Sequence, residues 1–472
     1  MIIANYVDQL NSDFQGNPFI EALPPRLTKE SFMERLILTR PSPLEDRNRP
    51  AAERLDLLEM ITSFFVYMPW HFNLYNTIYS MAKRSYVSRN PADPAYWLLV
   101  KEKRKVVCDV YKADLPVPRG RTSGALIGYS GQGKSEILKM IMALFPPVII
   151  HKEYKGEIIG CLQIVALFIE ADRNTSVIGI CNQIFEQADG LLGTRYYETY
   201  KAGTEAAKVA GVVTVCHLHG VGIIVLDEIQ ELSLRKSGGE NGIVSFLLHL
   251  VNRAGPSVLF VGTPDAPLLR NEAMRYIRRS SGIPEVRPLA QESSDWKDFL
   301  EELWRYQYTK HSTELTTEIE DSLHALSRGV PELTIEIYKR TQAVLIQNES
   351  PENPERITPE FLEEVAMTYL AREIEAVKLW DRPYGGGRPA DAPSIPRGRH
   401  RPRSRSKPMR DEKPESVTET NDKENNRVPC DQETMTLLEI ASMGAADTDE
   451  WLKNLRRAKI IKDPMEFLEV SK

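Results

Sequence analysis

The sequence predicts an α/β fold in which a parallel five-stranded sheet lies between helices and is followed by a helical region. Residues 121–290 alternate short apolar runs with amphipathic helical patterns, which is typical of a parallel sheet covered by helices. A glycine-rich loop at 128–135 separates one apolar run from a helix, which is the usual position of a phosphate-binding loop. Residues 293–380 have a helical pattern throughout.

The expected strands are apolar on both faces, as buried parallel strands are. They are residues 124–128, 161–171, 221–228, 256–262 and 285–289. Amphipathic patterns between these runs predict the covering helices, at residues 135–144, 177–192, 241–254 and 268–279. The helical region divides into four successive units, at residues 296–308, 316–328, 331–346 and 358–377.

Changes in composition divide the chain into five regions. The N-terminal one mixes helical patterns with many prolines, and its core helix is expected at residues 55–68. The fourth is rich in proline, glycine and charge and holds too few apolar side chains to order itself. The regions are a mostly helical N-terminal segment (1–110), the phosphate-binding domain (111–290), a helical lid (291–380), a basic proline-rich linker (381–430) and a short helical tail (431–472).

The composition excludes several classes of protein. The net charge of −6 gives no indication of nucleic-acid binding, so any basic surface must be local. The longest apolar run, residues 158–169, is shorter than the ~18 residues that a membrane span needs, so we expect no membrane association. The N-terminus lacks a secretory signal pattern. The five cysteines are scattered and form no CxxC pair, which is typical of a reducing cytoplasm.

The loop at 128–135 fits the pattern G-x-x-x-x-G-K-[ST] in full. Its glycines let backbone N–H groups surround a phosphate, and the following helix N-terminus adds partial positive charge. Lys134 can bridge the β- and γ-phosphates, and the Ser135 hydroxyl can hold Mg²⁺. We therefore expect ATP and Mg²⁺ at a site formed by Gly128, Tyr129, Ser130, Gly131, Gln132, Gly133, Lys134, Ser135 and Glu136.

Two acids end the apolar strand at 221–228. We expect Asp227 to hold the metal together with Ser135, and Glu228 to polarise the attacking water as a base. Alone, an apolar run followed by Asp-Glu is also typical of a solvated strand end. Because a complete phosphate-binding loop precedes it in the same domain, the pair indicates nucleotide hydrolysis.

Two further elements complete the predicted site, and each has an ordinary alternative. Thr263 ends the strand at 256–262, where its hydroxyl could sense the γ-phosphate or could form a simple turn before proline. Arg275, Arg278 and Arg279 cluster near the end of the next predicted helix. They could complement the helix dipole, or one could act as an arginine finger on a neighbouring subunit, a group worth roughly 10³–10⁵ in rate in GTPases.

In this order, these elements resemble the AAA+ ATPases of the initiator clade. The chain is more specifically similar to the TnsC family, the ATP-dependent regulators of bacterial cut-and-paste transposons. Over about residues 15–375, the segments that carry this resemblance are NPFIEALPP (17–25), YVSRNP (86–91), VLDEIQELSLRKSGG (225–239), VGTPDAP (261–267), RYIRRSSG (275–282) and LSRGVPEL (326–333).

The resemblance implies an AAA+ fold and a function. TnsC proteins assemble as homo-oligomeric rings or helical filaments on double-stranded DNA. They receive the target site from a TnsD or TniQ type protein and recruit the transposase subunits TnsA and TnsB, and ATP hydrolysis resets the assembly. By motif, Arg278 or Arg279 would be the finger and Thr263 the sensor. The implied location is the nucleoid of a bacterial cytoplasm. The resemblance is also compatible with a regulator of a CRISPR-associated transposon.

Related rings bind DNA after the second strand of the sheet, which implies Arg173, Asn174, Arg195 and Lys201 as DNA-binding residues. Ordinary surface charge is the alternative for each. The basic block at 396–410 predicts either a nucleic-acid-binding arm or a solvated linker. Many AAA+ lids carry an arginine after the glycine that precedes the third lid helix, whereas here Arg328 lies before Gly329. Its contact with nucleotide is therefore left open.

Two other functions compete with a transposition regulator. One is another initiator-clade AAA+ ATPase, such as a helicase loader, which shares the ATPase core but not the segments at 17–25 and 86–91. The other is a small-molecule P-loop kinase, which needs no arginine from a neighbour. The helical lid argues against the kinase.

Overall fold

The computed structural model describes most of the chain up to Asp381. The described residues are 1–36, 44–98, 100, 123–173, 175–232, 242–243, 246–247, 250–266, 268, 277, 282–348 and 355–381. The expected linker at 381–430, apart from Asp381, and the tail at 431–472 lie outside them, as do part of the helix expected at 241–254 and most of the helix expected at 268–279. Among the described residues, no helix is long and apolar enough to cross a membrane.

The central sheet has four parallel strands in the order β2-β7-β6-β5. Residues 285–289 do not form the expected fifth strand; Val286 makes a single parallel bridge to Gly128 beside β2. The expected strand at 161–171 is also corrected, because the chain leaves one sheet at Val165 and enters another. The strands are β2 (Ser123–Ile127), β5 (Ala166–Glu170), β6 (Ile223–Asp227) and β7 (Ser257–Gly262).

A second sheet, which the sequence patterns did not predict, lies beside the first. In it β3 (Val148–Tyr154) and β4 (Glu157–Ile164) form an antiparallel hairpin, and β1 (Ile2–Ile3) pairs with β3 in parallel. The hairpin turns at Lys155 and Gly156, with φ of 52° and 85°. Two successive residues with positive φ between two strands are typical of the tight turns that suit the strand twist. The dipeptide Lys-Gly between two apolar runs was the available signal.

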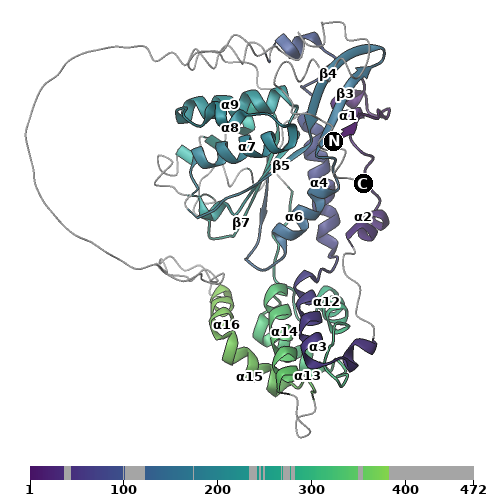
Figure 1. The fold of residues 1–472 in the computed structure, drawn as a ribbon, viewed down its shortest axis with the longest axis vertical. Coiled ribbons are helices and arrows are strands. Elements are labelled where there is room, and N and C mark those ends of the chain that lie inside the picture. The colour runs from purple at the N-terminus through teal and green to yellow at the C-terminus, as the bar shows by residue number, and fades with distance from the viewer. Residues whose placement is uncertain are drawn as a thin grey trace, which may run out of the picture.

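Helices cover both faces of the central sheet (Figure 1). Alternate residues of β6 point to opposite faces: Ile224 and Leu226 pack with α7 and α9, while Ile223 and Val225 pack with α6 and the N-terminal helices. Strands β2, β6 and β7 are therefore buried on both faces, as their apolar sequence predicted, whereas every second residue of the edge strand β5 is only half-buried. The covering helices are α6 (Lys134–Ala143), α7 (Val177–Leu192), α8 (Tyr196–Tyr200) and α9 (Glu205–Leu218), and the π-helical turn η6 (Leu250–Ala254) packs near them.

The N-terminal helices pack partly on the sheet and partly on the helical region that follows it. The helix expected at 55–68 is wrong: α3 ends at Leu58, a 3₁₀ turn follows, and the long helix α4 starts at Pro69. Proline suits the first position of a helix, and Pro69 is the first residue of α4. The elements are η1 (Ser12–Phe14), α1 (Pro18–Glu21), α2 (Lys29–Leu36), η2 (Leu44–Asn48), α3 (Ala51–Leu58), η3 (Glu59–Ser63) and α4 (Pro69–Ser85).

The helical region lies below the carboxyl ends of the central strands in Figure 1 and has its own apolar core. The last of its four expected units is two helices that break at Leu370. The guanidinium of Arg54 on α3 forms a buried ion pair with Glu355, so the N-terminal segment is tied to this region. Its helices are α12 (Ser294–Trp304), α13 (Thr317–Ser327), α14 (Pro331–Gln347), α15 (Pro359–Tyr369), α16 (Ala371–Lys378) and the turn η8 (Leu379–Asp381).

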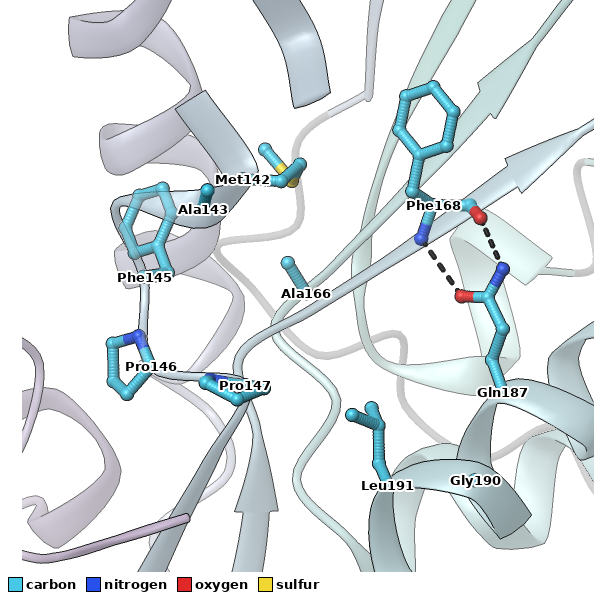
Figure 2. A pocket seen from close by; sticks show the side chains of 10 residues that line it. All are labelled: Met142, Ala143, Phe145, Pro146, Pro147, Ala166, Phe168, Gln187, Gly190 and Leu191. Atoms are coloured by element: carbon cyan, nitrogen blue, oxygen red, sulfur yellow. Dashed lines mark hydrogen bonds between the residues drawn. The ribbon is translucent and has the colours of Figure 1, made fainter. Parts of the chain in front are cut away.

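Strand β5 is an edge strand of the central sheet, and a side chain covers part of that edge. Figure 2 shows the amide of Gln187 on α7 paired with the backbone of Phe168: Phe168 N–H donates to Oε1 at 3.1 Å, and Nε2 donates to the Phe168 carbonyl. An open apolar groove of about 460 Å³ runs beside it, between α6 and α7. Because Gln187 occupies these backbone groups, another strand cannot pair with β5 at Phe168 without displacing it.

Three of the buried histidines, each with a lowered pKa, make the fold sensitive to acid. Burial lowers the pKa of His71 to about 3, that of His151 to about 4 and that of His219 to about 3. In each case the unfolded chain binds a proton more readily than the folded chain below pH ~6.5, so stability falls as the pH falls. The Met68 N–H donates to Nδ1 of His71 at 3.0 Å, and protonation of that nitrogen would break this hydrogen bond.

We expect the free energy of unfolding to fall by on the order of 1 kcal/mol per buried histidine between pH 6.5 and 5.5. The variant His71→Gln should show a shallower pH dependence in urea titrations, because one of these protons is no longer taken up on unfolding. The matched control His311→Gln, at an exposed position, should leave the dependence unchanged. Equal slopes for His71→Gln and the unmodified protein would contradict the prediction.

Candidate nucleotide-binding site

The phosphate-binding loop joins β2 to α6, as its sequence predicted. Gly128 N–H donates to the Gly262 carbonyl at 3.1 Å, which attaches the start of the loop to β7. A Cβ on Gly128 would lie 2.6 Å from the Val286 carbonyl oxygen, so only glycine fits there. Gly133 has φ 74° and is the N-cap of α6, a left-handed conformation that glycine adopts without strain. At Gly133 the loop backbone therefore turns directly into the N-terminus of α6.

Lys134 is buried at the first position of α6. Its Nζ donates to the Tyr129 carbonyl within the loop at 2.6 Å. Burial lowers the pKa of Lys134, and the nearby carboxylates of Glu228, Asp227 and Glu332 partly oppose this shift. A bound phosphate would give this ammonium group a stronger charged partner than a carbonyl oxygen. The amide Nε2 of Gln132, also buried in the loop, has no hydrogen-bond acceptor among the described residues.

Asp227 ends β6 and is 2% exposed. Burial raises the pKa of its carboxyl, whereas hydrogen bonds from the Ser135 hydroxyl and the Glu228 N–H and the charge of Lys134 lower it. Its Oδ1 accepts the Glu228 N–H at 2.8 Å, and its buried Oδ2 has no hydrogen-bond donor in the described part of the chain. A buried carboxylate oxygen without a donor, beside a serine hydroxyl, fits the oxygen ligands that Mg²⁺ takes. The two predicted metal ligands therefore lie together.

Glu228 follows directly, in a left-handed backbone conformation with φ 57° and ψ 42°. Such a conformation in a residue other than glycine is uncommon and concentrates at functional sites. Burial and the charge of Asp227 raise the pKa of its carboxyl, and Lys134 opposes this shift. Glu228 is the N-cap of the 3₁₀ turn η4 (Ile229–Glu231). Within that turn, the side-chain amide of Gln230 donates to the Glu228 carboxylate.

Thr263 comes directly after β7, next to the strand that carries the loop. Its N–H donates to Oε1 of Gln230 at 3.2 Å. The structure thus connects Thr263 to Glu228 through Gln230, which the sequence patterns did not single out. Parallel strand order places the ends of β2, β7 and β6 at one edge of the sheet, and the predicted loop, sensor and acids all lie there.

The helical region reaches the loop at two points that the sequence did not predict. The Glu332 N–H at the start of α14 donates to the Gly131 carbonyl at 3.2 Å. The ring of Trp380 stacks on Tyr129, with centroids 4.3 Å apart and an interplanar angle of 11°. Arg328 ends α13 with φ 55° as its C-cap. The loop therefore contacts both the start of α14 and the end of the helical region.

The remaining predicted residues lie elsewhere. Arg278, Arg279 and Asn174 lie outside the described residues. Arg173 is exposed after β5, and Arg195 is exposed as the N-cap of α8. Lys201 is exposed and pairs with Glu198 of the same helix, which is ordinary surface pairing. Ser130 and Glu136 are exposed on the loop and in the first turn of α6.

Comparison with known proteins identifies the central region. Residues 118–269 match the family model of the AAA domain. This stretch of the chain is an AAA domain. With its phosphate-binding loop, parallel sheet and helical C-terminal region, the fold is the AAA+ P-loop α/β fold that the sequence predicted.

Several solved structures also match the chain, and a search of curated proteins found no match. The Orc1 protein of Aeropyrum pernix, solved in complex with DNA, is 16% identical over 61% of this chain and 68% of its own, with a TM-score of 0.37. Cdc6p of Pyrobaculum aerophilum is 16% identical over 60% and 70%, also with a TM-score of 0.37. A Walker-type ATPase of Pyrococcus abyssi is 15% identical over 60% and 75%, with a TM-score of 0.33.

The assignment of Asp227 to Mg²⁺ is testable. The variant Asp227→Asn should need at least ~10-fold more Mg²⁺ for half-maximal nucleotide binding, because a charged metal ligand is replaced by a neutral one. Titration of Mg²⁺ at fixed nucleotide, followed by fluorescence of a labelled ATP, measures this. The control Asp298→Asn, exposed on α12, should bind as the unmodified protein does. An unchanged Mg²⁺ requirement in Asp227→Asn would exclude Asp227 as a ligand.

Proposed function

We propose that this protein is an ATPase that hydrolyses ATP to ADP and phosphate and uses the reaction as an assembly switch. The observation that carries the proposal is the buried Asp227 carboxylate, whose Oδ2 lacks a donor among the described residues and whose pKa is lowered by the neighbouring Ser135 hydroxyl. The charge of Lys134 lowers the pKa of Asp227, and the Glu228 N–H donates to Asp227 Oδ1. A buried acid, a hydroxyl, a lysine and a second acid are the groups that P-loop hydrolases use.

Each side chain has a distinct role in this proposal. The loop N–H groups and Lys134 hold the phosphates, and Ser135 and Asp227 hold Mg²⁺, which neutralises charge on the phosphate oxygens when bound. The Glu228 carboxylate accepts the proton of the attacking water. Its raised pKa lies closer to neutral pH than that of an ordinary glutamate, which suits a general base. Thr263 holds the water or the γ-phosphate. An arginine of a second subunit, Arg278 or Arg279, would complete the site.

We further propose that the assembly regulates DNA transposition. In this proposal the protein oligomerises on duplex DNA, receives a target from a TnsD or TniQ type protein, and recruits TnsA and TnsB. The support is sequence resemblance at 17–25 and 86–91, two segments that contact each other in the structure. The Asn17 amide donates to the carbonyls of Tyr86 at 2.8 Å and Arg89 at 3.3 Å. The resembling segments thus form one structural unit.

In the same proposal, each region of the chain has its own task. Residues 111–290 would bind and hydrolyse nucleotide, and residues 291–380 would act as a lid that contacts the loop through Glu332 and Trp380. Duplex DNA would contact Arg173, Arg195 and Lys201 through its phosphates, so binding would weaken with salt and depend little on sequence. Lys201 would exchange its pairing with Glu198 for a phosphate.

Glu228→Gln is expected to bind ATP normally and to lose hydrolysis, because the amide cannot accept the proton from water. DNA-bound oligomers should therefore persist in this variant when ATP is supplied. Phosphate release and sedimentation with duplex DNA measure the two effects. Glu231→Gln, on the same turn, is the matched control and should hydrolyse ATP as the unmodified protein does. Rapid turnover in Glu228→Gln would exclude the base assignment.

Assembly itself is tested by electron microscopy of the protein with duplex DNA and a non-hydrolysable ATP analogue. We expect rings or helical filaments around DNA that are absent with ADP. ATPase activity should rise with duplex DNA and with protein concentration together. Activity that is linear in protein and requires a metabolite would instead identify a kinase. DNA-bound rings that do not respond to TnsA, TnsB or a TniQ-type protein would leave the ATPase standing and remove the role in transposition.

A further inference from the structure

Gln230 joins two residues of the candidate site and has no role in the function proposed above. It lies in the middle of η4, the 3₁₀ turn that follows β6. Its amide nitrogen donates to the Glu228 carboxylate, and its amide oxygen accepts the Thr263 N–H at 3.2 Å. Within the described part of the chain, the Glu228 carboxylate accepts a hydrogen bond from this amide alone. One side chain therefore bridges the end of β6 and the end of β7.

The chemistry of the two partners determines how the amide must lie. An ionised carboxylate only accepts hydrogen bonds, and a backbone N–H only donates them. The Gln230 nitrogen must therefore face Glu228, and its oxygen must face Thr263. A glutamate would lose the donor, and an asparagine is one methylene shorter. Glutamine satisfies both partners at once.

The backbone brings Gln230 to this position through a close approach of the turn to β7. A Cβ on Gly262 would lie 2.6 Å from Cγ1 of Ile229 and 2.9 Å from Oε1 of Gln230. Because Gly262 has no side chain, the turn packs directly against the last residue of β7. Glu228 itself has φ 57°, a conformation that persists only where surrounding contacts hold it. The turn and the amide together determine where its carboxylate points.

We propose that Gln230 is a positioning residue that orients the Glu228 carboxylate and couples it to the backbone of Thr263. The proposal rests on the role of Glu228 as the base. A movement of the end of β7 at Thr263, such as contact with a γ-phosphate would cause, reaches the carboxylate through two hydrogen bonds of one side chain. In this way the site would align its base only when the sensor end of β7 is in place.

The decisive variant is Gln230→Glu, measured in the full-length protein with ATP, Mg²⁺ and duplex DNA. It keeps the size of the side chain and an oxygen for the Thr263 N–H, but it replaces the donor to Glu228 with a second carboxylate. We expect kcat to fall on the order of 10²-fold, the loss associated with a misplaced catalytic group, while KM and the dissociation constant for ATP change little. A kcat equal to that of the unmodified protein would overturn the proposal.

Three further measurements separate positioning from stability. Gln230→Met keeps the shape without charge and should also lose kcat, and it serves if Gln230→Glu folds poorly. Gln187→Glu removes a comparable amide-to-backbone contact at the edge of β5, away from the site, and should keep its kcat. Thermal midpoints are measured for all variants. The proposal fails, and the role is structural, if the kcat of Gln187→Glu falls to the same extent. It also fails if both Gln230 variants show a raised KM and a lowered thermal midpoint together with the lowered kcat.

The variant Glu228→Gln separates this inference from the function on which it rests. If Glu228→Gln still hydrolyses ATP, the base assignment fails and the role of Gln230 fails with it. If Glu228→Gln is inactive while Gln230→Glu has normal kcat, the base assignment stands and only the positioning role fails. If both lose kcat with ATP binding preserved, both are supported.

Discussion

The parallel pairing of β7 between β2 and β6 is the constraint on which the candidate site depends. Ile127 is in register with Gly262, and Leu226 with Phe260, so three strands end at one edge of the sheet. The loop, Thr263 and Glu228 each follow one of these strands directly, and Asp227 is the last residue of β6. A shift of one residue in this register would turn each strand's buried side chains to the opposite face. The apolar packing of both faces therefore holds the chemistry in place.

A second level of organisation joins this edge to the rest of the molecule. The helical region contacts the loop through Glu332 and Trp380, and it contacts the N-terminal segment through the buried pair of Arg54 and Glu355. Removing one partner of a buried ion pair typically costs ~3–5 kcal/mol. The N-terminal segment is thus shared between the sheet and the helical region. Movement of the helical region relative to the sheet would have to be accommodated by this segment.

The helix at 177–192 and the phosphate-binding loop with its flanking strand and helix were predicted well from the sequence. The helix expected at 177–192 has those bounds in the structure, and the loop, its strand and its helix lie where the pattern put them. The failures share one cause, which is that local pattern does not say which partner a stretch will find. Residues 161–171 are largely apolar, yet they divide between two sheets with different partners. Residues 55–68 are apolar at helical spacing, yet the chain turns at Leu58 to pack on α14.

By itself, the sequence determined the chemistry that the loop and the acids offer, because a glycine-rich loop before a helix and an acid pair after an apolar strand have local physical causes. It also determined that β2, β6 and β7 are buried on both faces. Only the tertiary structure showed that Gln230 bridges Glu228 and Thr263, that Asp227 Oδ2 lacks a donor among the described residues, and that Trp380 stacks on Tyr129. These contacts join residues from separate strands and helices, and the distance between such residues is set by packing rather than by spacing in the chain.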